Sequence, residues 1–503
     1  MKKILTMLLT ALMLVCSSAV FTKAESADAT AEEPAMNLSL DGFTTDLCFT
    51  RPYLLSLTPA REMSVLWLMK AEGEAYVRFG ETEALGTEVA AEAYALEGMR
   101  TSATPEAYAD LPEENPDLTV IQQVAVLKDL KPATTYYYQV ISQVGDQREV
   151  SKVYNFTTAP EDGSEFSFIL LSDLQLKMES PATVEEAGKT KPDFILYPGD
   201  LQNAPWRAGE WFPVEGCFIK EEEQGKTWFE IMQQEEEGVE LLSYAPIFPC
   251  PGNHEIDDQR VGSDKEFASD MNNYSLKIYQ QLFRTLYPEQ KAEYGGQHWY
   301  SADWGDLHIA SIAALRWAAW DAEEAPGWPM FESLEADSEQ MIWLKEDLAK
   351  SEKPYKWVAM HFHMMNRGED VQIGLAVPQP DPNDPTKVIY PEGDNGQNVL
   401  RPIFEENGVC AVCFGHSHVY ERYLVNGVNY IEAASIGNNY RGENDPYHPT
   451  GIKPEVEFND FRSFLHVSKT DEGLKAEGIQ ASLPESGEGE IGQVFDNYII
   501  DAR

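Results

Sequence analysis

Five short apolar segments of this chain each end in residues that can bind a metal ion. Each one reads as a β-strand followed at once by aspartate, asparagine or histidine: FSFILLSD (166–173), DFILYPGD (193–200), YAPIFPCPGNHE (244–255), KWVAMHFH (356–363) and VCAVCFGHSH (409–418). Open α/β sheets bind their ligands beyond the carboxyl ends of the strands. Each ending alone has an ordinary explanation as a helix N-cap or a turn, but the five together predict one shared site.

The candidate ligands at these strand ends are carboxylates, imidazoles and one amide, without thiolates. They are Asp173, Asp200, Asn253, His361, His416 and His418. This donor set suits Zn, Fe or Mn. A carboxylate with both oxygens free can bridge two ions roughly 3.5–4 Å apart, and Asp200 is the best candidate for the bridge. Because paired ions activate a bound water and clamp phosphate oxygens, the pattern favours hydrolysis of a phosphoric ester.

The amino terminus has the pattern of a secretory signal peptide. A basic start precedes an apolar stretch at residues 4–21, and small residues follow it. We therefore expect residues 1–24 to be a signal peptide and the protein to be secreted or held in the cell envelope. An uncleaved membrane anchor and a lipidated Cys16 are the alternatives. The small and acidic residues 25–40 are interpreted as a linker.

The remainder of the chain divides into two regions with different patterns. Residues 41–160 contain strand-like segments such as MSVLWLM (63–69), which alternates with Trp67 buried, and a Leu-Lys-Pro-Ala-Thr-Thr-Tyr stretch that predicts a sandwich corner at Tyr136. This region resembles a fibronectin type III-like domain, a type that more often positions a neighbour than carries out chemistry. Residues 161–503 have the strand–helix–strand pattern of an α/β domain. Within them, the acidic stretch 220–240 is interpreted as a solvated helix.

The charge of the chain restricts its partners. It has 84 acidic and 38 basic residues and a formal net charge of −46. Such a surface repels nucleic acid and anionic lipid, which are bound through lysine and arginine. We therefore expect a small phosphorylated substrate as the partner, no nucleic acid, and no membrane once the signal peptide is cleaved. The oligomeric state stays open.

The number of cysteines argues against a complete disulfide framework. Five of the six lie beyond the signal peptide, and an odd number argues against a complete set of bridges. Cys410 and Cys413 stand in an apolar segment and are interpreted as core residues. A bridge between Cys217 and Cys250 stays open.

The motifs SDLQ (172–175), GDLQ (199–202), GNHE (252–255), MHFH (360–363) and GHSHVYER (415–422) resemble those of calcineurin-like metallophosphoesterases. Among these the chain is most similar to the purple acid phosphatases, which also carry a fibronectin-like domain before the catalytic one. The resemblance implies an all-β sandwich domain followed by an α/β metallophosphoesterase domain, a four-layer α/β/β/α sandwich with two metal ions. It implies a secreted phosphomonoesterase in which a metal-bridged hydroxide attacks phosphorus.

The resemblance also implies a role for each residue. It places the first metal at Asp173, Asp200 and His418, and the second at Asp200, Asn253, His361 and His416. His254 would protonate the leaving alkoxide as a general acid. Glu255 or another acid would orient that histidine.

The sequence departs from the family at several positions. Asn203 stands where purple acid phosphatases have a tyrosine ligand, so we expect no charge-transfer colour, and ferric iron is not specified. Gln175 stands where simpler members have a histidine ligand, and we expect it to ligate weakly. His363 and Arg367 are candidates to replace the substrate-facing histidines of plant-type enzymes, and Asn203 is a third candidate for substrate contact.

Other functions of the same pattern stay open. One is a phosphodiesterase or nucleotide hydrolase that uses the same centre. Another is a non-catalytic extracellular binding protein with a degenerate metal site. The remaining histidines are interpreted as surface or core residues; they are His298, His308, His448 and His466.

Overall fold

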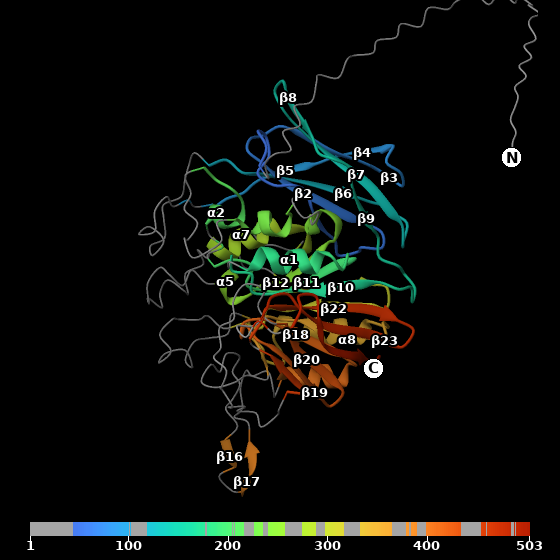
Figure 1. The fold of residues 1–503 in the computed structure, drawn as a ribbon, viewed down its shortest axis with the longest axis vertical. Helices are drawn as coiled ribbons and strands as arrows, with labels where there is room; N and C mark the ends of the chain where they lie inside the picture. The colour runs from blue at the N-terminus through green and yellow to red at the C-terminus, as the bar shows by residue number, and fades with distance from the viewer. Residues whose placement is uncertain are drawn as a thin grey trace, which may run out of the picture. The chain divides into compact units, whose positions relative to one another are not determined.

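A computed structural model of the chain describes most of its residues beyond the amino terminus (Figure 1). The described residues are 44–99, 101, 118–176, 179–203, 205, 207–215, 226–234, 240–256, 274–287, 297–315, 332–364, 379–381, 384–389, 399–433, 454–458, 460–483, 487 and 489–503. The predicted signal peptide and linker therefore lie outside them. No helix in these ranges is long and apolar enough to cross a membrane.

Two antiparallel sheets form the amino-terminal domain. Sheet A has the order β1 (Tyr53–Leu55), β2 (Met63–Met69), β6 (Ile121–Leu127), β5 (Glu92–Ala95). Sheet B has the order β4 (Thr87–Ala90), β3 (Glu74–Gly80), β7 (Thr135–Val144), β8 (Gln147–Val150), and β9 (Tyr154–Thr157) pairs with β7. The predicted corner is present, because the backbone N–H of Lys131 donates to the Tyr136 hydroxyl at 3.0 Å. The prediction of an all-β domain is confirmed.

Strand β2 is buried on both faces, whereas its sequence predicted one buried face. Val65 and Trp67 pack in the core of the sandwich. Leu66 and Leu68 point the other way and belong to the core of the following domain. Sheet A is therefore a middle layer, and one continuous apolar core joins the two domains.

The second domain contains two further sheets. Sheet I has the order β12 (Ile247–Cys250), β11 (Phe194–Pro198), β10 (Ser167–Leu170), β22 (Ser463–Thr470), β23 (Gly473–Gln480), β24 (Val494–Ile500). Sheet II has the order β13 (Tyr300–Trp304), β14 (Leu307–Ser311), β15 (Tyr355–Ala359), β18 (Ala411–Phe414), β20 (Val428–Glu432), β19 (Tyr420–Val425), β21 (Val456–Phe458). The sheets pack on each other through aromatic rings, with Phe168 of β10 5.2 Å from Trp357 of β15 between ring centroids.

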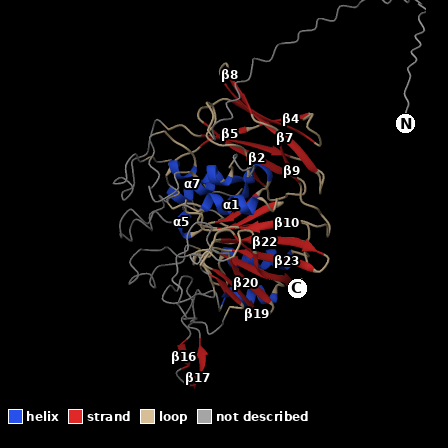
Figure 2. Cartoon of the chain, viewed as in Figure 1, coloured by secondary structure: helices blue, strands red, loops and turns tan. Residues whose placement is uncertain are grey.

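Helices connect and cover these sheets (Figure 2). Helix α1 (Ser180–Gly188) joins the parallel strands β10 and β11, and α8 (Glu339–Lys350) joins the parallel strands β14 and β15. The remaining helical segments are α2 (Ala208–Trp211), α3 (Trp228–Met232), α4 (Leu241–Tyr244), α5 (Asn253–Ile256), α7 (Tyr274–Leu282), the 3₁₀ turn η2 (Arg284–Leu286) and α9 (Arg401–Glu406). A hairpin of β16 (Gln379–Asp381) and β17 (Asp384–Ile389) stands apart from both sheets. The predicted α/β class is confirmed.

The interpretation of residues 220–240 as a solvated helix is wrong for the part that the structure describes. Residues 228–232 form a short helix, α3, whose Trp228, Phe229 and Ile231 are fully buried. The ring of Phe229 lies 5.1 Å from that of Tyr53 in the sandwich. The apolar side chains of α3 thus join the two domains. The acidic residues around them in the sequence suggested solvent exposure instead.

The cysteines that the structure describes are buried thiols. Cys410 and Cys413 are fully buried in β18 and its approach, as their interpretation as core residues predicted. Cys250 is also fully buried. Cys217 lies outside the described residues, so the bridge between them stays untested.

His308 joins sheet II to a helix through two carboxylates. Its Nδ1 lies 2.7 Å from Asp303 on the neighbouring strand, and its Nε2 lies 2.9 Å from Asp347 on α8. Burial lowers the pKa of His308, but the hydrogen bonds and charges of the two aspartates outweigh this and raise the pKa to about 9. The interpretation of His308 as a surface or core histidine did not predict this clamp, by which we mean its contacts with Asp303 and Asp347.

We expect the clamp to make stability depend on pH. Because the pKa of His308 is higher in the folded chain than its ordinary value of about 6.5, its contribution is complete below about pH 6.5 and is lost as the pH rises through 9. The loss should be below about 3 kcal/mol, since water screens the half-exposed Asp303. The unfolding free energy of the parent and of His308→Gln, measured in urea between pH 6 and 10, should converge at the alkaline end. A constant difference would contradict the clamp.

Candidate metal centre

The strand ends of both sheets meet at one place and bring the candidate ligands together. Asp173 follows β10, Asp200 follows β11 and Asn253 follows β12, all in sheet I; His361 follows β15 and His416 follows β18 in sheet II. Strands β10, β11 and β12 are parallel, as are β15 and β18, so their carboxyl ends lie at the same edges.

Two groups of potential ligands share one carboxylate. Asp200, His361 and His416 form the first group, and Asp173, Asp200 and His418 form the second, with the ligand atoms of each group within 4.8 Å of one another. Both groups therefore contain Asp200, the residue expected to bridge. The side-chain oxygen of Asn253 lies 3.0 Å from Nε2 of His361 and 2.8 Å from Nδ1 of His416, which adds the amide to the first group.

Backbone contacts orient the side chains of these groups. Nδ1 of His361 lies 2.7 Å from the carbonyl oxygen of Pro198, so it donates there and leaves Nε2 facing the other ligands. The carboxylate of Asp173 accepts from the backbone N–H of His416 at 3.0 Å, and Nε2 of His418 lies 3.3 Å from the same carboxylate. These side chains are therefore held in place before any ion binds.

Glycines next to the ligands leave room for them. A Cβ on Gly252 would lie 2.2 Å from Oδ1 of Asp200, and one on Gly415 would lie 2.5 Å from Oδ2 of Asp173. Gly199 has φ of +87°, and a Cβ there would meet Nδ1 of His361 at 2.6 Å. The glycine in GD, GN and GH is thus required by the crowding of the ligands. Both this cradle and the carboxylate, amide and imidazole donors fit a divalent ion.

Backbone strain is concentrated at the same residues. Asp173 and Asp200 have φ of 54°, His416 of 77° and His418 of 60°, all in the left-handed region that non-glycine residues rarely adopt. Each such conformation costs about 1–3 kcal/mol and persists where surrounding contacts impose it. Strain at four candidate ligands is what a site selected for function rather than for stability would have.

The electrostatics of the centre favour an ionised Asp200. Burial raises the pKa of Asp200, but the charges of His361 and His254 outweigh burial and hold the pKa below its ordinary value. For His361, burial lowers the pKa while Asp200 and Asp173 raise it, to about 9. Burial and the neighbouring His361 lower the pKa of His416.

Glu255 holds the loop of Asp200 in place, whereas the family resemblance suggested it as an acid that orients His254. Its carboxylate accepts from the backbone N–H groups of Asp200 at 2.8 Å, Leu201 at 2.9 Å and Gly252 at 2.7 Å. Burial and the charge of Asp200 raise its pKa to about 8. The structure shows no hydrogen bond from Glu255 to His254, so within the described residues it fixes the loop of Asp200 instead.

Replacing Glu255 with alanine is expected to damage both the fold and metal binding. Three buried N–H groups would lose their acceptor, which should lower the unfolding free energy by roughly 3–5 kcal/mol. Displacement of the Asp200 loop should also weaken metal affinity by about 10–100-fold. Urea unfolding and metal titration would measure these effects, with the exposed Glu352→Ala as the control. Parent-like values of both quantities would contradict this role.

The carbonyl of Asn203 orients His254. Nδ1 of His254 lies 2.8 Å from that oxygen, its backbone N–H donates to Oδ1 of Asp200 at 3.0 Å, and its Nε2 is 3.7 Å from Oδ2 of Asp200. The side-chain amide of Gln175 donates to Oδ2 of Asp200 at 2.9 Å. The side-chain amide of Asn203 donates to the backbone carbonyl of Gln175 at 3.2 Å. Gln175 and Asn203, which both depart from the family pattern, thus both contact the centre. The contact of His254 with a backbone carbonyl has no signal in the sequence, because every residue has such a carbonyl.

His363, one of the candidates for substrate contact, lies in a buried environment. It is 1% exposed, its ring stacks on Phe414 at 4.8 Å, and its Nε2 lies 3.3 Å from Glu432 and 3.6 Å from Glu421. These contacts are those of a residue that packs sheet II. Arg367, the other candidate for substrate contact, lies outside the described residues.

Comparison with known proteins agrees with this architecture. Residues 51–158 match the family model of the purple acid phosphatase N-terminal domain, and residues 166–420 match that of the calcineurin-like phosphoesterases. The structure of a purple acid phosphatase from yellow lupin (Lupinus luteus) seeds matches with a TM-score of 0.59 and 16% identity, over 89% of this chain and 73% of that one. At this identity the match shows the fold.

Curated relatives are similar over part of their length. A phosphoenolpyruvate phosphatase of Allium cepa is 21% identical over 63% of this chain and 53% of its own length. A protein of Arabidopsis thaliana named probable inactive purple acid phosphatase 9 is 23% identical over 63% of this chain and 44% of its own length. The chain spans about half the length of these two relatives.

The family models, the fold and the strand-end ligands lead to one assignment. The catalytic-domain model alone covers about half of the chain, and the second model accounts for the sandwich in front of it. This chain belongs to the calcineurin-like phosphoesterase family and carries the N-terminal domain of the purple acid phosphatases.

Proposed function

We propose that this protein is a secreted or cell-envelope phosphatase that uses two metal ions to hydrolyse phosphoric monoesters. The observation that carries the proposal is the pair of ligand groups that share Asp200, with His254 beside them. One group alone would suit a structural ion. Two groups with a common carboxylate suit the paired ions that assist displacement at phosphorus.

The residues present fit the metal ions that the family implies. Asp173, Asp200 and His418 would hold one ion, and Asp200, Asn253, His361 and His416 the other. Bound there, the ions would bind phosphoryl oxygens, supply an activated water and offset the negative charge of the chain. Gln175 would contribute at most a weak contact, because its amide donates to Asp200.

His254 is the proposed proton donor to the leaving group. A carbonyl oxygen can only accept, so Nδ1 keeps its proton for Asn203 and Nε2 is the nitrogen that faces the centre. A protonated ring would give the Nε2 proton to the leaving alkoxide, which otherwise departs as a poor leaving group. The fixed Nδ1 contact holds the ring in that orientation.

The substrate class and the location are inferred from a relative and from the sequence. A monoester substrate is favoured by the relative named a phosphoenolpyruvate phosphatase. A phosphodiesterase or nucleotide hydrolase would use the same centre. The location follows from the pattern of residues 1–24, and the strongly negative charge disfavours nucleic acid as a partner.

A non-catalytic binding protein is the second candidate. Gln175 and Asn203 replace ligands of the family, and a relative of this chain is named inactive. The presence of every other ligand and of His254 argues for catalysis instead.

Hydrolysis of p-nitrophenyl phosphate and of its bis-ester tests the proposal. The purified protein would be loaded in turn with Mn²⁺, Zn²⁺ and Fe, and its metal content measured beside turnover. We expect two ions per chain and faster turnover of the monoester. Two bound ions without turnover would favour the binding protein, and faster turnover of the bis-ester would favour the phosphodiesterase.

A further inference from the structure

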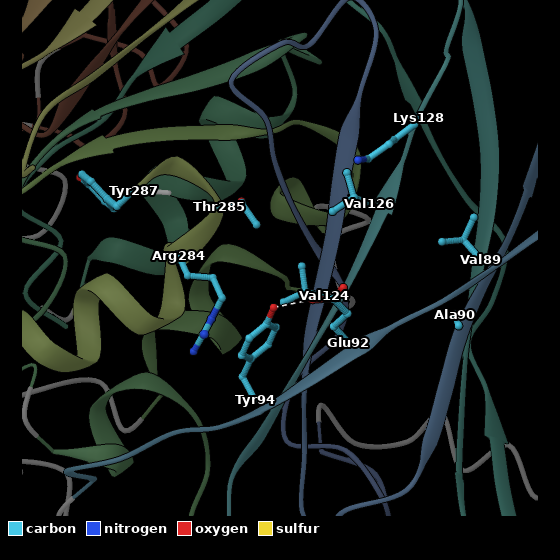
Figure 3. A pocket seen from close by; sticks show the side chains of 10 residues that line it. All are labelled: Val89, Ala90, Glu92, Tyr94, Val124, Val126, Lys128, Arg284, Thr285 and Tyr287. Carbon is cyan, nitrogen blue, oxygen red and sulfur yellow. Dashed lines mark hydrogen bonds between the residues drawn. The ribbon is translucent and has the colours of Figure 1, made fainter. Parts of the chain in front are cut away.

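A pocket of about 490 Å³ lies where the sandwich meets the α/β domain (Figure 3). Strands β5 and β6 of the sandwich line it with Glu92, Tyr94, Val124 and Val126, and Lys128 directly follows β6. The 3₁₀ turn η2 of the other domain contributes Arg284 and Thr285. None of these residues belongs to the metal centre, and the volume is in the range of about 300–1,000 Å³ typical of small-molecule sites.

Arg284 is held in one orientation by the sandwich. Its Nε donates to the side-chain oxygen of Gln122 at 2.5 Å, and its guanidinium carbon lies 4.0 Å from the centroid of the Tyr94 ring. The amide of Gln122 is itself fixed, because it donates to the hydroxyl of Tyr53 at 2.7 Å and to the carbonyl of Leu282 at 3.0 Å. The fork of Arg284 is therefore prepared for a ligand before one binds.

The cations of the pocket have no carboxylate partner within the described part of the chain. Elsewhere, basic residues such as Arg51, Lys131 and Arg422 pair with acids. Arg284 is half-buried and uses only Nε in hydrogen bonds to described residues, and Lys128 is exposed and unpaired there. A partly desolvated guanidinium is unfavourable when no counter-ion lies beside it, and none of the described residues supplies one to Arg284, so an anion at this position would stabilise the folded chain.

An apolar wall and one carboxylate complete the lining. Val124 and Val126 form an apolar wall on β6. Glu92 adds one negative charge, and the Tyr94 hydroxyl donates to it at 2.5 Å. The pocket thus has two positive charges and one negative charge on a chain that is otherwise strongly acidic.

We propose that this pocket binds a small organic monoanion, with a carboxylate held by Arg284 and an apolar body against Val124 and Val126. The planar guanidinium matches a carboxylate through two parallel hydrogen bonds. A dianion such as phosphate is disfavoured, because Glu92 and the net charge of the chain repel it more strongly. Ligand binding at this seam would strengthen the docking of the two domains and raise the unfolding temperature.

Calorimetric titration of the purified protein with 2-naphthoate tests the proposal without any measurement of hydrolysis. We expect one naphthoate to bind per chain and the neutral 2-naphthamide to bind at least about tenfold more weakly, since hydrogen bonds to charged groups contribute most of the affinity. Arg284→Lys should weaken binding by roughly 10–100-fold, because it keeps the charge and loses the fork. Lys128→Met, a change at an exposed residue that should not disturb folding, should weaken it by about 3–10-fold.

A variant of the metal centre separates this pocket from the proposed active site. Asp200→Asn should leave naphthoate binding unchanged even if it removes the metal ions and all hydrolysis. The proposal would be overturned by equal binding of the amide, by binding that is lost in Asp200→Asn and kept in the pocket variants, or by no binding at all. Preference for inorganic phosphate with the same dependence on Arg284 would also overturn it, in favour of a phosphate site.

Discussion

Replacing Asp200 with asparagine is expected to remove metal-dependent hydrolysis while the protein stays folded. Asp200 is common to both ligand groups, and an amide has one oxygen and cannot bridge two cations. Each ion would then lose a direct ligand, which should cost more than the roughly 10–100-fold in affinity seen for supporting residues. With both ions affected, turnover should fall by at least about 10³-fold. Metal content and p-nitrophenyl phosphate turnover, measured on the same samples, would test this.

The fold should tolerate that change because asparagine keeps one of the acceptors. Oδ1 of Asp200 accepts from the backbone N–H of His254 at 3.0 Å, and the side-chain oxygen of asparagine can do the same. Asp193→Asn is the matched control, because Asp193 precedes β11 at the opposite end of the strand, where its carboxylate accepts from Ser167 N–H at 2.8 Å. Parent-like metal content and turnover in Asp200→Asn would contradict the shared-carboxylate centre.

The candidate ligands of the centre are visible in the sequence because each one follows a buried strand. An apolar run such as FILYP that is followed by GD places its acid just beyond the carboxyl end of a strand. The topology brings five such strand ends together. The groups that hold these ligands are far less visible. Pro198 and Asn203 act through backbone carbonyls, which every residue has. Glu255 differs from an ordinary helix acid only in being buried beneath Asp200, which depends on the tertiary fold.

The contact between the two domains also could not be predicted from the sequence. The pattern of β2, MSVLWLM, predicts a sandwich strand, and alternate residues do fill that core. The serine at position 64 breaks the apolar character of the other face, and nothing local indicates that Leu66 and Leu68 are covered by another domain. In the same way, the acidic residues around α3 suggest solvent exposure, while Trp228 and Phe229 lie in the joint core. Burial against a distant segment overrides the local pattern in both cases.

Replacing His254 with glutamine is expected to slow hydrolysis by an amount that depends on the leaving group. For an alkyl monoester such as glycerol 2-phosphate, loss of the proton donor should lower turnover by about 10²–10⁴-fold. For p-nitrophenyl phosphate the loss should be less than about tenfold, because nitrophenolate is stable without a proton and needs little general-acid help. Turnover of both substrates at saturating metal would measure the difference, with His466→Gln on β22 as the matched control.

The comparison of two leaving groups distinguishes proton donation from binding. If His254 only contacts the phosphoryl group, both substrates share that contact and should slow equally, which would contradict the role of general acid. Metal content must be the same in the variant and the parent, because the backbone N–H of His254 also contacts Asp200. That contact survives any side-chain change, so the ligand groups should persist in His254→Gln. A selective loss with alkyl substrates at full metal content would then assign the proton to Nε2, the nitrogen that the Asn203 carbonyl leaves free.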